Sequence, residues 1–154
     1  MNGSTLLLSI KPRYADAIFS RQKRVELRRV RPRVGPGDLV LVYVSSPRCA
    51  LEGAFEVERV LEEKPSILWR HVAHNAGISR EEFTNYFEGR ENAYAIVIKR
   101  VWQLTHVSLS AMRKVKIRPP QSYHYLDKTT AMRLTLGGDG PKSSSTKRVR
   151  SSAT

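Results

Sequence analysis

Apolar residues ahead of position 127 fall into short runs and short alternating stretches, a pattern typical of strands separated by helices. Six of these stretches predict strands: residues 5–10, 24–28, 39–44, 50–61, 93–104 and 122–126. Helical spacing or helix-start signals mark four further segments: residues 12–20, 65–77, 79–87 and 107–115. Because the two kinds of element are interspersed and strands outnumber helices, the predicted fold class is α+β with a curled or closed sheet.

Helix ends are indicated by a few specific residues. Pro12 suits a first helical position, where its missing N–H would have no partner in any case. Ser79 and Glu82 form a capping-box pair, in which each side chain bonds an otherwise unpaired backbone amide. Gly77 and Gly89 follow apolar helical stretches and are expected to end them.

The stretch at residues 24–28 is basic but also periodic. Val25 and Leu27 point one way, while Glu26 and Arg28 lie together on the opposite face. An acid beside an arginine orients its guanidinium, whose planar fork suits a phosphate or a base edge. The alternative is a plain exposed ion pair, worth less than ~1 kcal/mol.

Charge is the strongest signal in the composition, with a formal net charge of +13. Residues 137–154 form a Ser- and Gly-rich tail in which four basic residues stand against one acid, a net charge of +3, which leaves +10 on residues 1–136. We therefore expect one folded domain at 1–136, a disordered basic tail, and a polyanionic partner, nucleic acid first.

Several other classes of protein find no support in the sequence. The longest apolar run, Leu39 to Val44, is too short to cross a membrane, and the N-terminus has no basic region of the secretory kind. Cys49 is the single cysteine, and no Cys/His spacing of the zinc type occurs. These features predict a cytoplasmic protein that acts away from membranes, with no metal site and no cofactor.

The residues from 9 to 29, "SIKPRYADAIFSRQKRVELRR", resemble the ASCH domain, a branch of the PUA-like superfamily. The family signature Gly-x-Lys-x-x-Glu-x-Arg places its last three residues on Lys23, Glu26 and Arg28. Its glycine falls on Arg21, which is a departure from the pattern. The similarity continues through "GDLVLVYVSSP", "GAFEVERVL" and "AYAIVIKRV", so it covers residues 5 to 126.

The resemblance implies a PUA-like β-barrel with short helices packed around it, and a cleft built around Lys23, Glu26 and Arg28. It also implies an RNA-binding protein, acting in transcription or translation regulation, or one that takes a nucleoside-like ligand. The oligomeric state does not follow from it.

Other candidate ligand contacts lie at predicted strand ends. Lys11 follows the first strand, and Ser45 and Ser46 end the apolar strand at 39–44. Gln121 and Tyr123 belong to "QSYHYL", where an aromatic ring beside basic residues could stack on a base. Core packing of the tyrosines is the alternative, and Trp69 and Trp102 are expected in the core.

Two other functions remain open. A hydrolase branch of the family cleaves acylated nucleosides such as N4-acetylcytidine with a threonine three residues after the lysine, but Glu26 stands there in this chain and cannot replace a hydroxyl nucleophile. If the protein is an enzyme, Lys23 and Glu26 would be the catalytic pair. A DNA-binding transcriptional regulator fits the charge too, although the helices on either side of Gly77 make no convincing helix-turn-helix.

Overall fold

The structure is a computed structural model that describes residues 5–114, 117–127 and 129–132. The tail predicted to be disordered at 137–154 lies outside the described residues, so that prediction is untested. Within the described part, every predicted strand and helix is present, and the strands predicted at 5–10 and 39–44 have the predicted bounds whereas the other elements have changed bounds. No helix of this part is long and apolar enough to cross a bilayer.

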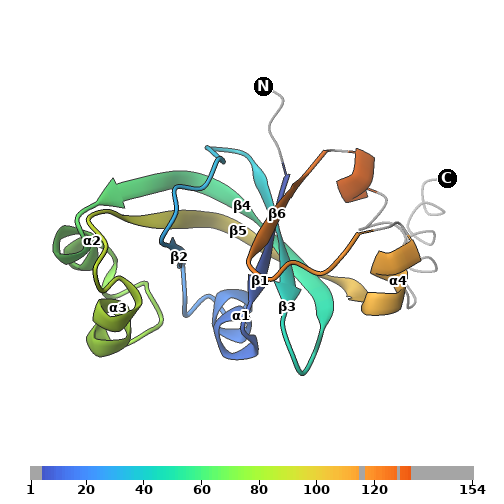
Figure 1. The fold of residues 1–154 in the computed structure, drawn as a ribbon, viewed down its shortest axis with the longest axis horizontal. Helices are drawn as coiled ribbons and strands as arrows, with labels where there is room; N and C mark the ends of the chain where they lie inside the picture. The colour runs from blue at the N-terminus through green and yellow to red at the C-terminus, as the bar shows by residue number, and fades with distance from the viewer. Residues whose placement is uncertain (1–4, 115–116, 128, 133–154) are drawn as a thin grey trace, which may run out of the picture.

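Six strands form a single sheet. They are β1 Thr5–Ile10, β2 Val25–Arg28, β3 Leu39–Val44, β4 Ala50–Glu63, β5 Ala93–Ser108 and β6 Tyr123–Leu126. The strand order is β2-β5-β4-β3-β1-β6, and the pairs are antiparallel except β1–β3, which is parallel. The long strands β4 and β5 carry register shifts and curl the sheet, so that its edge strands β2 and β6 lie on the same side of the molecule (Figure 1).

Around the sheet lie the short helices α1 Pro12–Phe19, α2 Pro65–Val72, α3 Arg80–Tyr86 and α4 Leu109–Lys114, and residues 129–132 are also helical. The first begins at Pro12, and the capping box of Ser79 and Glu82 is formed at the start of α3. A curled mixed sheet that forms a half-barrel, with short helices around it, confirms the predicted α+β, PUA-like fold class.

The sheet is buried on both faces, which explains why β1 reads as a continuous apolar run. Leu6 and Leu8 enter the core on the side of α1, whereas Leu7 enters the core on the side of α4. A third core lies between β2, β5 and helices α2 and α3, where Val25 and Leu27 pack as their alternation predicts.

The prediction that both tryptophans are core residues is wrong for one of them. Trp69 packs partly buried against the core of α2 and α3, in contact with Phe83. Trp102 is 40% exposed, and the guanidinium of Arg100 lies over its ring at 5.5 Å. It lies on β5 opposite Ala54.

Candidate functional site

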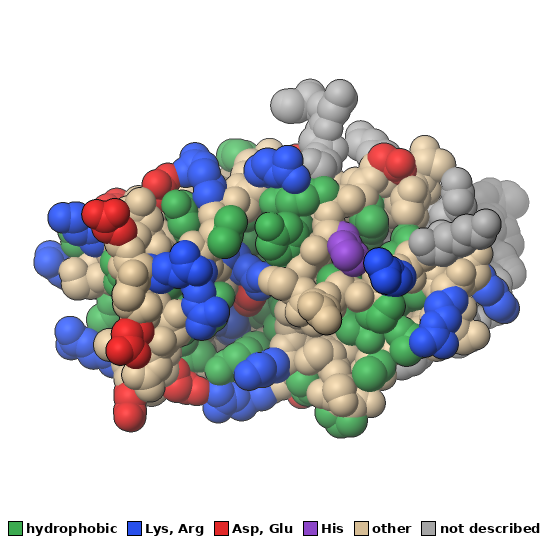
Figure 2. Space-filling view, viewed as in Figure 1, with side chains coloured by type: hydrophobic (Ala, Val, Ile, Leu, Met, Phe, Trp, Pro, Cys, Tyr) green, Lys and Arg blue, Asp and Glu red, His purple; other side chains and the backbone are tan. Residues whose placement is uncertain are grey.

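Two adjoining cavities lie in the opening between the edge strands β2 and β6. The first, of about 210 Å³, is enclosed by the end of β1, α1, β2 and α3, and we call it the lysine cavity because Lys23 lines it. The second, of about 170 Å³, is enclosed by β1, β6 and the segment from Arg28 to Pro32, and we call it the arginine cavity. Arg28 and Tyr86 line both cavities. Figure 2 shows basic side chains gathered around the hollow between β2 and β6.

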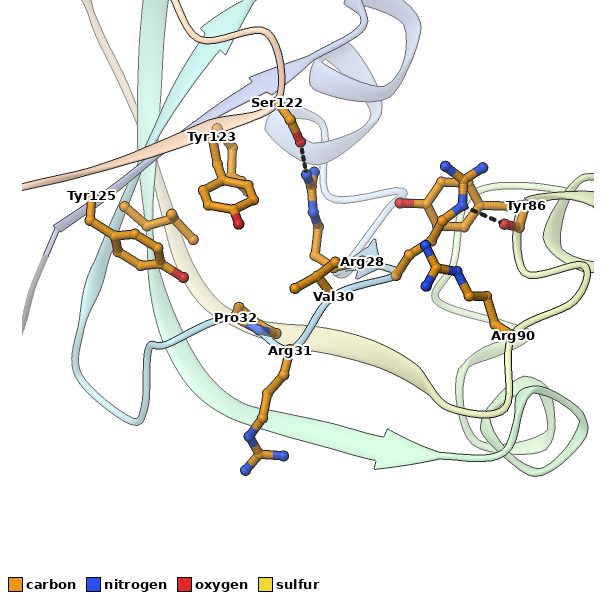
Figure 3. A pocket seen from close by; sticks show the side chains of 12 residues that line it. Arg28, Val30, Arg31, Pro32, Tyr86, Arg90, Ser122, Tyr123 and Tyr125 are labelled. Carbon is orange, nitrogen blue, oxygen red and sulfur yellow. Dashed lines mark hydrogen bonds between the residues drawn. The ribbon is translucent and has the colours of Figure 1, made fainter.

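Arg28 is fixed at the boundary between the cavities from two sides. Its Nη1 donates to Glu26 Oε2 at 3.3 Å, as the two-residue spacing predicts, and its Nη2 donates to Ser122 Oγ at 2.6 Å (Figure 3). The side chains of Arg28 and Glu26 are only 15% and 9% exposed, so this is a half-buried pair and not a plain surface ion pair. The bond to Ser122 joins the two edges of the sheet through side chains.

Lys23 lies at the inner wall of the lysine cavity and is only 3% exposed. Its Nζ donates to the carbonyl of Ala76 at 2.9 Å and lies 5.4 Å from the centre of the Tyr14 ring. Burial lowers the pKa of Lys23 below its usual 10.5, while the charges of Glu26 and Glu82 act in the opposite direction. A lysine that is desolvated and faces a cavity is suited to proton transfer.

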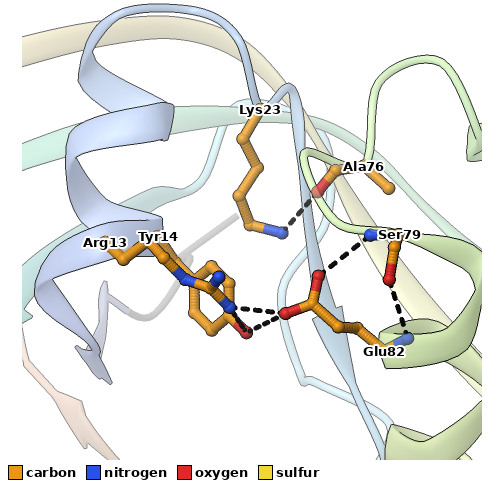
Figure 4. Close-up of polar contacts among 6 residues, drawn as sticks. All are labelled: Arg13, Tyr14, Lys23, Ala76, Ser79 and Glu82. Atoms are coloured by element: carbon orange, nitrogen blue, oxygen red, sulfur yellow. Dashed lines mark hydrogen bonds and ion pairs between the residues drawn. The ribbon is translucent and has the colours of Figure 1, made fainter.

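Glu82 connects the two helices at the wall of the lysine cavity (Figure 4). Its Oε1 accepts from the backbone amide of Ser79 at 3.0 Å, and its Oε2 accepts from Arg13 Nη2 at 2.5 Å and from Tyr14 Oη at 3.5 Å. The hydrogen bonds from Ser79 and Arg13 lower the pKa of Glu82, so it stays a carboxylate. Sequence reasoning recognised it only as a capping residue, which accounted fully for its local pattern.

The wall that the two cavities share is built on Tyr86. Burial raises the pKa of Tyr86, and its hydroxyl donates to the carbonyl of Leu27 at 3.1 Å. The guanidinium of Arg29 lies over its ring at 4.2 Å, and Arg29 Nε donates to the carbonyl of Tyr86 at 2.7 Å. These contacts hold the end of α3 against the segment that follows β2.

The aromatic wall of the arginine cavity comes from β6. Tyr123 and Tyr125 pack edge to face with their ring centres 5.6 Å apart, and Tyr123 is 41% exposed. Tyr125 is held in place by Arg33, whose amide donates to its hydroxyl at 2.7 Å and whose guanidinium lies over its ring at 4.1 Å. Tyr123 therefore offers an exposed ring on a rigid support.

The residues proposed from the sequence separate into two groups. Those that line the cavities are Lys11, Lys23, Glu26, Arg28 and Tyr123. Those outside the described lining of both cavities are Ser45, Ser46 and Gln121. The end of β3 does lie beside β1, since the Ser45 amide donates to Ile10 at 3.0 Å, but the turn that follows is tied by Arg48 to Asp16 and Glu52.

Two serines at the cavities were not among the residues proposed from the sequence. Ser9 lines the lysine cavity, and Ser122 lines the arginine cavity. Ser9 lies on β1 and its amide donates to the carbonyl of Ser122 at 2.8 Å. The pairing of β1 with β6 brings them together, and no local signal in either segment predicts it. Among the described residues, no three or more His, Cys, Asp or Glu side chains are grouped so as to hold a metal ion.

Comparison with known proteins identifies a family, related sequences and related structures. The family model of the ASCH domain matches residues 8–102. An "ASCH domain-containing ribonuclease" from Zymomonas mobilis is 27% identical over 130 residues, which cover 83% of this chain and 88% of that protein. The crystal structure of ASCH from Zymomonas mobilis superposes with a TM-score of 0.82 at 26% identity, covering 88% of this chain and 96% of that one.

A more distant likeness concerns the fold alone. The N-terminal domain of Staphylothermus marinus McrB superposes with a TM-score of 0.53 at 11% identity, covering 87% of this chain and 94% of that one. The family model spans more than half of the 154 residues, and the superposition with the Zymomonas mobilis structure covers 88% of this chain. The chain belongs to the ASCH domain family.

Proposed function

We propose that the protein binds RNA in the two adjoining cavities between β2 and β6, with Arg28 as the principal contact. The observation that carries this proposal is the position of Arg28, which lines both cavities and is oriented by Glu26 and Ser122. A guanidinium that is fixed before the ligand arrives loses little conformational entropy on binding, so it favours a phosphate or a base edge strongly.

The remaining support comes from charge and from a relative. The net charge of +13 favours a polyanion, and Arg29, Arg31 and Arg90 line the arginine cavity with Arg28. The Zymomonas mobilis relative is named a ribonuclease, so RNA is the polyanion that this relative acts on.

Binding of a labelled single-stranded RNA to Arg28→Ala, Glu26→Gln and the wild type tests the proposal. A charge-assisted hydrogen bond contributes about 1.5–3 kcal/mol, so Arg28→Ala is expected to weaken binding by about tenfold or more, and Glu26→Gln by less. Arg100→Ala is the matched control, because Arg100 is also paired with a glutamate, Glu56, but lines neither cavity. Equal affinities for Arg28→Ala and the wild type would contradict the proposal.

The salt dependence separates a polyanion from a small neutral ligand. If about four phosphates of a single strand are neutralised, the logarithm of the binding constant falls with a slope of about −3 against the logarithm of salt concentration. A slope near zero would indicate a nucleoside-like ligand. Competition by a duplex DNA of matched sequence decides against a DNA-binding regulator if the duplex is the weaker competitor.

A second candidate function is RNA cleavage, which the burial of Lys23 beside Glu26 favours. In this reaction the 2′-oxygen bonds to the adjacent phosphorus, and the bond from phosphorus to the 5′-oxygen breaks. Glu26 takes the proton of the 2′-hydroxyl, and protonated Lys23, made more acidic by burial, gives a proton to the departing 5′-oxygen. The products are a 2′,3′-cyclic phosphate and a 5′-hydroxyl end.

Cleavage is tested with an end-labelled RNA and the variants Lys23→Met and Lys99→Met, purified in parallel. Loss of general acid–base catalysis is expected to lower the rate by roughly 10²–10⁴ in Lys23→Met. Lys99→Met removes an exposed lysine that lines neither cavity and is expected to retain most activity. Undiminished cleavage by Lys23→Met would contradict this role.

Release of acetate from N4-acetylcytidine would favour amide hydrolysis, with Ser9 as the hydroxyl to test.

A further inference from the structure

The arginine cavity differs in charge from the lysine cavity that it adjoins. The lysine cavity holds the carboxylates of Glu26 and Glu82, whereas the described lining of the arginine cavity contains four arginines and no acid. A phosphate is therefore repelled less in the arginine cavity. Two different chemical environments side by side favour a ligand with two different parts.

Within the arginine cavity, Arg90 is the cation most available to a ligand. Arg28 is bound to Glu26 and Ser122, Arg29 is held by Tyr86, and Arg31 pairs with Glu62. The guanidinium of Arg90 has no hydrogen-bond or ion-pair partner among the residues that the structure describes. Figure 3 shows it beside Tyr86, at the wall that the two cavities share.

Tyr123 supplies a platform for a base in the same cavity. Its ring meets Tyr125 at 69°, so the two rings do not stack face to face, and Tyr123 remains 41% exposed. Leu6, Leu8 and Val30 add apolar surface to the lining. An exposed aromatic ring beside cations that follow a backbone is the arrangement that binds unpaired bases, whereas bases in a duplex are already stacked on each other.

From these observations, and on the basis of the proposed RNA binding, we propose that the arginine cavity is a second nucleotide subsite. Arg90 binds a phosphate, Tyr123 stacks on the base, and the backbone passes Arg28 on its way to the nucleotide in the lysine cavity. The ligand is therefore single-stranded RNA of at least two consecutive unpaired nucleotides, and not a free nucleotide or a duplex.

Competition for a fluorescein-labelled adenylate octamer tests the subsite. The competitors are AMP and the dinucleotide pApA, and the proteins are full-length wild type, Tyr123→Ala, Tyr123→Phe and Trp102→Ala. In the wild type, pApA is expected to compete about fivefold or more better than AMP. In Tyr123→Ala, pApA is expected to compete no better than AMP, and competition by AMP itself is expected to stay unchanged. Tyr123→Phe keeps the aromatic ring and should keep the gain of pApA over AMP. Trp102→Ala removes an equally exposed aromatic residue beside an arginine, lines neither cavity and also keeps the gain.

The possible failures are distinguishable. If pApA competes no better than AMP in the wild type, or if Tyr123→Ala retains the gain, the second subsite is overturned while RNA binding stands. If Tyr123→Ala weakens AMP as much as pApA, the mononucleotide itself occupies the arginine cavity, which also overturns the inference. If the wild type does not bind the octamer at all, the proposed function fails and the inference fails with it.

Discussion

The lysine and arginine cavities share a wall but differ in burial along one continuous segment of chain. In the lysine cavity, Lys23 and Glu26 are almost fully buried, and burial lowers the pKa of Lys23. In the arginine cavity, Arg29 and Arg31 are exposed, so their charges act through solvent and are screened by salt. Within nine residues of the chain, from Lys23 to Arg31, the surroundings thus change from a buried site suited to proton transfer to an exposed site suited to attracting anions.

The comparison shows that the position of each cation in the fold, and not its residue type alone, determines the role that the cation can play. Lys23 is buried because the loop at Ala76 and Gly77 and the ring of Tyr14 pack against it, whereas Arg29 and Arg31 further along the chain are exposed. Changes confined to one cavity should therefore leave the properties of the other intact. The predictions below test that separation.

The largest effect is expected from Gly77→Ala, which fills space beside Lys23. Gly77 has φ +68°, and a Cβ there would lie 2.8 Å from Lys23 Cβ. Overpacking of this kind costs about 1–3 kcal/mol, in addition to the cost of a left-handed backbone. Gly89→Ala is the control, because Gly89 has φ +79° and nothing within 4 Å of the added atom. Urea unfolding measures both, and equal losses would show that Lys23 is not tightly packed.

A smaller change is expected in how stability depends on pH in Lys23→Met. Burial lowers the pKa of Lys23 in the folded protein below the unfolded value near 10.5, so the folded state carries the cost of the buried charge at neutral pH. As pH rises from the folded pKa towards 10.5, the unfolded state binds more protons and Lys23 makes stability rise. The difference in unfolding free energy between wild type and Lys23→Met should therefore grow in favour of the wild type over this range.

At the upper end of this pH range, buried tyrosines change the stability in the opposite direction to Lys23. The comparison with Lys23→Met is therefore needed to isolate the contribution of Lys23. Burial raises the pKa of Tyr86, so its contribution to stability is lost as pH rises above 10. This contribution is common to wild type and Lys23→Met and cancels in the difference. A difference that stays flat between neutral pH and 10 would mean that Lys23 is not desolvated as the structure indicates.

The arginine cavity is tested separately by Arg90→Gln. Removing one cation that contacts a single strand should reduce the slope of log affinity against log salt by about 0.7, with little change in stability. Arg59→Gln, an exposed arginine on β4 that pairs with Glu58 and lines neither cavity, should leave the slope unchanged. If both variants change the slope alike, the effect reports overall charge and not the cavity.

The smallest effect is expected at Arg21, where the ASCH signature has glycine. Arg21 adopts φ +68° between α1 and β2, a conformation that glycine reaches without steric cost. Arg21→Gly should therefore change the unfolding free energy by about +1 kcal/mol at most, whereas Arg21→Ala keeps the strain and should not stabilise. Neither variant should alter the affinity for RNA, because Arg21 lines neither cavity.

Sequence reasoning predicted the part of the site that lies on one strand. The period of two along β2 placed Glu26 and Arg28 on one face, and that face lies at the cavities because Val25 and Leu27 occupy the core on the other. The family signature added Lys23. The local sequence pattern is sufficient to predict contacts between residues that lie within a few positions of each other in the chain.

The residues contributed by distant segments could not be predicted in this way. Ser122 is 94 positions from Arg28 and reaches it only because β6 pairs with β1. Glu82 has a complete local explanation as a helix cap, so nothing in its own segment indicates its bond to Arg13, 69 positions away. Sheet order and helix packing, which depend on the whole chain, complete the site.

The pairing of β1 with β6 has a consequence for how the protein is made. Strand β1 pairs with β6, with Thr5 opposite Leu126, so one wall of the arginine cavity is synthesised well before the other. A chain emerging from the ribosome can assemble the contacts around Lys23 while residues 122–126 are still untranslated, but it has no Ser122 or Tyr123 to complete the neighbouring wall. Nascent chains therefore pass through a stage with half of the binding surface, and the full surface forms only after residues 122–126 have been added.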